Sequence, residues 1–62
     1  GQVKVVYLSP SGSKMTIIAS RKEICVTVLD PKGRVIAYDS AEKSLDDIDF
    51  KELIYFFQRR NL

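Results

Sequence analysis

The sequence predicts an α+β fold in which a four-stranded antiparallel β-meander, made of two hairpins, is packed on one face by a C-terminal α-helix (ββββα). A Leu-x-Pro-x-Gly phrase occurs twice, at residues 8–12 and 29–33. The segments beside each phrase alternate in the manner of strands, and the last third of the chain changes to helical spacing. At 62 residues we expect one domain over 1–62, with a core too small to be very stable alone.

The two repeated phrases predict hairpin turns of the same kind. In each phrase Ser or Asp takes the first turn position, Pro the second and Gly the left-handed fourth. This combination is typical of a three-residue hairpin loop with a bulge. We therefore predict strands over about residues 2–8, 13–20, 23–30 and 34–39. The repetition fits either an old duplication or two hairpins that use the same turn chemistry.

The turns also predict which side chains share a face of the sheet. They pair Val5 with Ile17, place Ile17 opposite Val26, and pair Val28 with Ile36. Because faces alternate along a strand, one face becomes wholly apolar or aromatic. We expect this inner face to contain Val3, Val5, Tyr7, Met15, Ile17, Ala19, Ile24, Val26, Val28, Ile36 and Tyr38.

The C-terminal segment has two candidate helix starts. Asp49 with Glu52 forms a capping box, and so does Ser44 with Asp47, so the helix begins near residue 45 or 49 and ends near 60. One apolar stripe, made of Phe50, Leu53, Ile54 and Phe57, should cover the inner face.

Other side chains of the predicted helix lie outside this stripe. Arg59 and Arg60 lie at its end, where the helix dipole favours cations. Tyr55 and Phe56 either pack on the flanks of the stripe or contact a partner.

The opposite, outer face of the sheet is unusually apolar for one that a single helix leaves uncovered. Seven of its twelve expected positions are apolar, whereas a solvated face normally alternates to polar. The face is predicted to contain Lys4, Val6, Leu8, Lys14, Thr16, Ile18, Cys25, Thr27, Leu29, Val35, Ala37 and Asp39. Strand propensity alone would explain Val and Ile there, but such patches also mark interaction sites. We expect a protein-interaction surface made of Val6, Leu8, Ile18, Leu29 and Val35, with Lys4 and Lys14 at its margin.

Residues able to support catalysis are scarce. The chain has no His and one cysteine, Cys25, which excludes an internal disulfide and the usual nucleophile and zinc arrangements. We interpret Cys25 as a packed thiol rather than a nucleophile. Asp46, Asp47 and Asp49 lack the Gly and distant Glu of a calcium loop, and their place at a helix start accounts for them. No enzymatic activity, metal or cofactor is therefore expected.

Nucleic-acid binding is the alternative function. Residues 1–38 carry a net charge of +4 and residues 39–62 carry −2. The basic residues that would contact phosphates are Lys14, Arg21, Lys22, Lys32 and Arg34. Proteins that bind single strands on a sheet usually stack bases on exposed aromatic rings, and Tyr38 would face outward only if the second hairpin slipped by one residue. The order of four strands and a helix is similar to that of the small single-strand-binding transcriptional coactivators, which dimerise and bind nucleic acid. The similarity is one of element order and assigns no residue a role.

The sequence contains neither an apolar run of membrane-spanning length nor the regions of a signal peptide, so a cytoplasmic location without membrane contact is expected. The function predicted is that of a small non-catalytic interaction module. Its expected partner is a second copy of the chain, forming a homodimer, or another protein.

Overall fold

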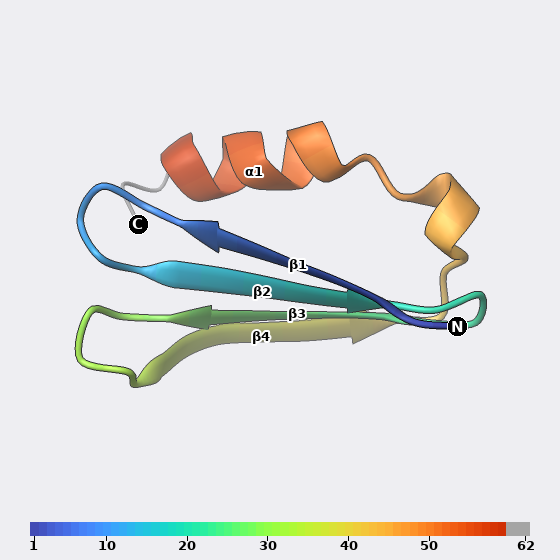
Figure 1. Cartoon of the computed structure of the whole chain (residues 1–62), viewed down its shortest axis with the longest axis horizontal. Helices are drawn as coiled ribbons and strands as arrows, with labels where there is room; N and C mark the ends of the chain where they lie inside the picture. The colour runs from blue at the N-terminus through green and yellow to red at the C-terminus, as the bar shows by residue number, and fades with distance from the viewer. Residues whose placement is uncertain (60–62) are drawn as a thin grey trace.

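The computed structural model describes residues 1–59 and confirms the predicted α+β fold (Figure 1). The strands form one antiparallel sheet in the order β1-β2-β3-β4, and the helix follows them. The elements are β1 (Val3–Leu8), β2 (Lys14–Ala19), β3 (Ile24–Leu29), β4 (Val35–Ala41), the short 3-10 helix η1 (Leu45–Asp47) and α1 (Phe50–Arg59). Arg60, predicted to end the helix, lies outside the described residues.

The two repeated phrases form the predicted turns. Gly12 donates its N–H to the Ser9 carbonyl at 3.0 Å, and Gly33 donates to the Asp30 carbonyl at 2.9 Å. Both glycines have positive φ, 95° and 85° respectively, which a side chain would strain. The turns lie side by side at one end of the sheet (Figure 1), where a Cβ on Gly12 would come within 3.4 Å of Pro31 Cβ. The second turn therefore packs against the first as well as reversing its own strand.

The predicted register is confirmed for β1, β2 and β3. Val5 is opposite Ile17, and Ile17 is opposite Val26. Because these pairs share the inner face, Ile17 in the central strand β2 is fully buried. The buried core consists of Met15, Ile17, Ala19, Ile24, Val28 and Phe57.

The predicted register of β4 is wrong beyond the first pair after the turn. Leu29 is opposite Val35, but Val28 is opposite Ala37 rather than Ile36. A bulge at this point adds one residue to β4, and a one-residue shift moves every later side chain to the other face. Tyr38 therefore leaves the inner face, and Asp39 moves onto it, opposite Val26.

The helix α1 packs on the inner face through the predicted apolar stripe, with Phe57 buried and with Phe50, Leu53 and Ile54 partly buried against the core. Phe57 is the only buried side chain among residues 50–59, and its ring lies nearly perpendicular to the Tyr7 ring, at an interplanar angle of 86° and a centroid distance of 5.3 Å. Gln58 also donates a hydrogen bond to the Tyr7 hydroxyl at 2.8 Å. These contacts place α1 beside β1 and β2, with β4 farthest from it (Figure 1).

Both predicted helix starts are used, each by a separate element. Ser44 caps η1, accepting from the Asp46 N–H at 3.3 Å. Asp49 caps α1, accepting from the Glu52 N–H at 3.1 Å. The 3-10 helix η1 therefore precedes α1, which begins at Phe50. Within residues 1–59, no helix is long and apolar enough to cross a membrane.

Candidate interaction surfaces

The outer face of the sheet, opposite α1, is organised as three rows that run across all four strands. Neighbouring strands lie about 4.8 Å apart and successive rows about 7 Å apart. The first row contains Lys4, Ile18, Cys25 and Ser40; the second contains Val6, Thr16, Thr27 and Tyr38; the third contains Leu8, Lys14, Leu29 and Val35. Four of the five predicted apolar contact residues, Val6, Leu8, Ile18 and Val35, are exposed there, and Leu29 is half-buried.

The corrected register adds two apolar side chains to the exposed surface of β4. Ile36 at the bulge and Tyr38 were expected to lie under the helix, but both are exposed, Tyr38 by 64%. Conversely, Ala37 and Asp39 leave the outer face. The sequence provides little indication of this exchange of faces. Alternation along a strand predicts that Tyr38 and Asp39 point to opposite faces of the sheet, but it does not determine which of the two faces the helix.

Tyr38 leans across the outer face toward β3. Its hydroxyl donates to Cys25 Sγ at 3.9 Å. This hydrogen bond raises the pKa of the Tyr38 hydroxyl above its ordinary value. Cys25 is free and half-buried, and its recorded side-chain partner is this phenol rather than a base that would activate it.

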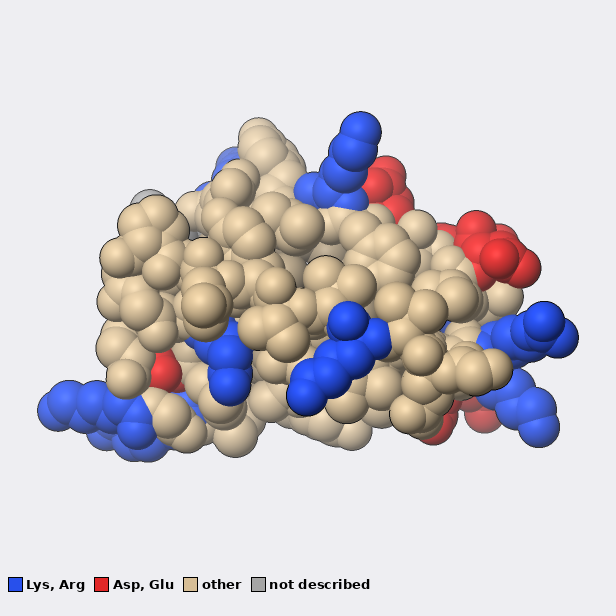
Figure 2. Space-filling view, viewed as in Figure 1, with Lys and Arg blue, Asp and Glu red and all other residues tan. Residues whose placement is uncertain are grey.

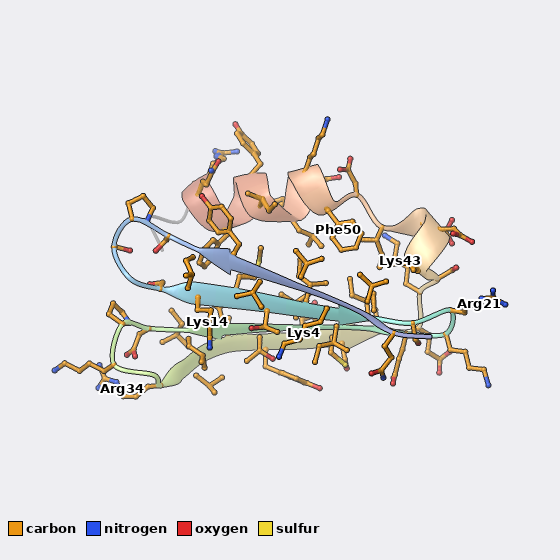
Figure 3. All side chains as sticks on the ribbon, viewed as in Figure 1. Lys4, Lys14, Arg21, Arg34, Lys43 and Phe50 are labelled. Carbon is orange, nitrogen blue, oxygen red and sulfur yellow. The ribbon has the colours of Figure 1, made fainter. Side chains whose placement is uncertain are left out.

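Two lysines supply the charge of the outer face. Figure 2 shows a largely uncharged surface crossed by two basic side chains, and the labels in Figure 3 identify Lys4 and Lys14 there. The three rows contain no acidic residue among residues 1–59. A partner that covers these rows therefore meets two ammonium groups without a carboxylate beside them.

The other basic residues predicted to contact phosphate are not gathered in one patch. Arg21 and Lys22 occupy the β2–β3 turn, and Lys32 and Arg34 belong to the β3–β4 turn at the opposite end of the sheet, as the labelled Arg21 and Arg34 show (Figure 3). Lys14 lies in the row with Leu29 and Val35, at the same end of the sheet as Lys32 and Arg34 and at the opposite end from Arg21 and Lys22.

Arg34 has a structural contact of its own. Its Nε donates to Asp30 Oδ2 at 2.7 Å, and the backbone N–H groups of Arg34 and Lys32 donate to Oδ1 at 2.8 and 2.9 Å. These bonds, led by that from the Arg34 backbone, lower the pKa of Asp30 below its ordinary value. Asp30 thus closes the second turn with its carboxylate.

A second surface lies on the inner side of the sheet, where α1 leaves the inner side of β4 uncovered. This β4 groove has a volume of about 330 Å³, within the range of ligand pockets. Its apolar lining is Ile24, Val26, Ala41, Ile48, Leu53 and Phe56, and its charged lining is Asp39, Lys43, Asp47, Asp49 and Glu52. Figure 2 shows acidic side chains around η1 and the start of α1. No local sequence pattern predicts this groove, because it depends on where α1 crosses the sheet.

Neither surface contains a recognisable metal centre. In the described part of the chain, no three His, Cys, Asp or Glu side chains are grouped so that they could hold a metal ion. The carboxylates beside the β4 groove include Asp49, which caps α1, and the first-turn residues Asp47 of η1 and Glu52 of α1.

Comparison with known proteins adds no relative. No family model matches the chain, and searches of curated proteins and of solved structures found no match.

Proposed function

We propose that this chain is a small non-catalytic interaction module that docks a protein on the outer face of its sheet. The observation that carries the proposal is the group of exposed apolar side chains on that face, Val6, Leu8, Ile18, Val35 and Tyr38. Each leaves apolar area in water at a cost of about 25 cal/mol per Å². A contiguous surface of this kind on a small domain is typical of a binding site.

The charge of the outer face favours a different protein over a second copy. Two copies docked face to face would bring together four ammonium groups, from Lys4 and Lys14 of each, with no carboxylate opposite within the described residues. Burying charges without partners is costly. A partner that presents apolar side chains beside Asp or Glu would instead pair with both lysines.

Affinity capture with matched variants tests the proposal. Val6→Lys and Val35→Lys add charge at exposed outer-face positions, and Tyr55→Lys makes the same change at an exposed position of α1. A captured protein is then purified and its affinity is measured by calorimetry. We expect binding at least about tenfold weaker for the outer-face variants and unchanged for Tyr55→Lys. Equal affinity for all three variants would remove the outer face as the docking site.

Sedimentation of the wild-type chain over a wide concentration range separates the two kinds of protein partner. A monomer at high micromolar concentration supports a different protein. A dimer that the Val6→Lys variant dissociates, and that strengthens as salt screens the lysines, identifies a second copy as the partner.

Single-stranded nucleic acid is the second candidate ligand, and the exposed Tyr38 is the observation that favours it. The corrected register provides an aromatic ring on the same sheet face as Lys4 and Lys14, so base stacking and phosphate contact are combined there. Fluorescence anisotropy with a labelled single-stranded oligonucleotide at low salt tests this function. Binding should fall steeply with salt and weaken in Tyr38→Leu, and a flat signal at low salt would exclude it.

A further inference from the structure

The strand β4 is an edge strand whose outer flank is open. It pairs with β3 on one side, and no other strand within residues 1–59 lies on its other side. All seven of its residues are exposed. Exposed edges are usually protected by Lys, Pro or a bulge, and Val35–Ala41 has no Lys and no Pro. The bulge protects only the end near Val35, so between residues 37 and 41 the backbone groups that point away from β3 face no strand within residues 1–59.

The β4 groove begins directly at this open edge. Asp39 and Ala41 of β4 line the groove together with Leu53 and Phe56 of α1. A new strand that paired with β4 would send alternate side chains to the inner side, because strand side chains alternate between faces. Those side chains would enter the groove, while the others would extend the outer face beside Tyr38.

The charge of the groove determines which strand fits. Its lining holds four carboxylates and one ammonium group, Lys43, which gives a net charge of −3. Lysine and arginine combine an apolar stem with a cationic end, so they suit a groove with an apolar floor and acidic rim. A segment whose inward positions carry Lys or Arg and one aliphatic residue is complementary to it.

Asp39 also selects against a second copy at this edge. Symmetric antiparallel pairing of two β4 strands about Tyr38 would put Asp39 of each copy diagonally opposite the other on the inner side. Diagonal neighbours lie about 7–8 Å apart, and like charges there are destabilising. A basic residue opposite the same carboxylate is stabilising, so the charge that repels a copy attracts a basic segment.

We propose that the open edge of β4 and the β4 groove bind an extended, basic and apolar peptide segment of another protein by strand addition. The backbone of the segment would pair with β4, and its inward Lys or Arg side chains would face Asp39 and Glu52. The groove lies on the opposite side of β4 from the outer face, and its test does not depend on the function proposed for that face.

The test uses a synthetic peptide and the full chain labelled with ¹⁵N. The probe is acetyl-Lys-Thr-Leu-Thr-Lys-Thr-amide, whose alternate residues supply two cations and one aliphatic side chain on one face. We expect amide shifts along β4 and the groove lining as the peptide is titrated to millimolar concentration. The same peptide with Glu in place of Lys, and the peptide with alternate amides N-methylated, should each bind at least about tenfold more weakly.

Matched protein variants locate the charges that act. Asp39→Asn with Glu52→Gln should weaken peptide binding several-fold, whereas Asp46→Asn, which removes a nearby carboxylate outside the groove lining, should not. Equal binding of the N-methylated peptide would overturn strand addition. Shifts confined to the outer-face rows, or none at all, would overturn the site. Shifts at β4 that depend on protein concentration without peptide would show that a second copy occupies the edge.

Discussion

Replacing Phe57 with Ala tests the inside-outside assignment on which both proposed surfaces depend. Phe57 is 3% exposed, and it is the only side chain of α1 that is fully buried within residues 50–59. Truncating a buried Phe to Ala costs about 3–5 kcal/mol, because transfer energy is lost and a cavity remains. For 62 residues, about 0.05–0.15 kcal/mol per residue gives a total stability of about 3–9 kcal/mol. Phe57→Ala should therefore remove between about a third and all of the free energy of unfolding.

The adjacent Phe56 provides the matched control. It is 49% exposed, so the same truncation one position earlier should cost about 1 kcal/mol or less. Urea and thermal unfolding followed by circular dichroism measure both variants. At about 4–8 °C per kcal/mol, the Tm should fall by at least about 12 °C for Phe57→Ala and by about 8 °C or less for Phe56→Ala. A larger loss for Phe56→Ala would mean that α1 presents a different face to the sheet, and both surfaces would then have to be reassigned.

Two further predictions concern the turns. The hydrogen bonds from Arg34 and Lys32 lower the pKa of Asp30 from 3.8, so the carboxylate stabilises the fold above its unfolded pKa, and this contribution is lost as the pH falls through the lower, folded pKa. Asp30→Ser should therefore reduce the fall in Tm between pH 5 and pH 2. An unchanged dependence of Tm on pH in this variant would contradict the role given to Asp30. Gly12→Ala and Gly33→Ala should each destabilise by about 1 kcal/mol in urea unfolding, because both positions have positive φ. A Cβ at Gly12 would meet Pro31 only at an ordinary contact distance of 3.4 Å, so the two losses should be similar. No loss in either variant would contradict the left-handed turn geometry.

The register of the first three strands could be predicted because the local signals agree. The first Pro-Gly turn and the apolar alternation independently place Val5 opposite Ile17. The short link at residues 20–23 then leaves one register for β3, with Ile17 opposite Val26. A slip of one residue would expose the whole core face of β2, so sequence and packing favour the same pairing.

The second hairpin could not be predicted in the same way, because two sets of β4 side chains compete for the inner face. Ile36 and Tyr38 are the more apolar set, so the sequence pattern predicts that they face the helix. The structure instead gives that side to Ala37 and Asp39, through a bulge after Val35. Alternation along a strand carries no information about an inserted residue, so the turn was predicted correctly and the face was not.

The two candidate surfaces also differ in how far the sequence predicts them. The outer-face residues of β1 and β2 follow from strand alternation, and Val6 and Ile18 are exposed as expected. The β4 groove depends on where α1 lies across the sheet, and Phe57 determines this through its contact with Tyr7. That position comes from tertiary packing between residues 50 apart in the chain, which no local pattern encodes.

The strand β4 belongs to both surfaces, so a ligand bound at one surface should change the affinity of the other. Tyr38 contributes to the outer face, and its neighbour Asp39 lines the groove on the other side. A segment added along β4 would widen the outer face by one strand, about 4.8 Å, and place new side chains beside Tyr38. A ligand of the outer face that contacts this widened edge would then bind with a different affinity when the groove is occupied. Thermodynamic linkage requires the reverse effect to be equal, so the peptide affinity measured with and without an outer-face ligand would quantify the coupling between the two surfaces.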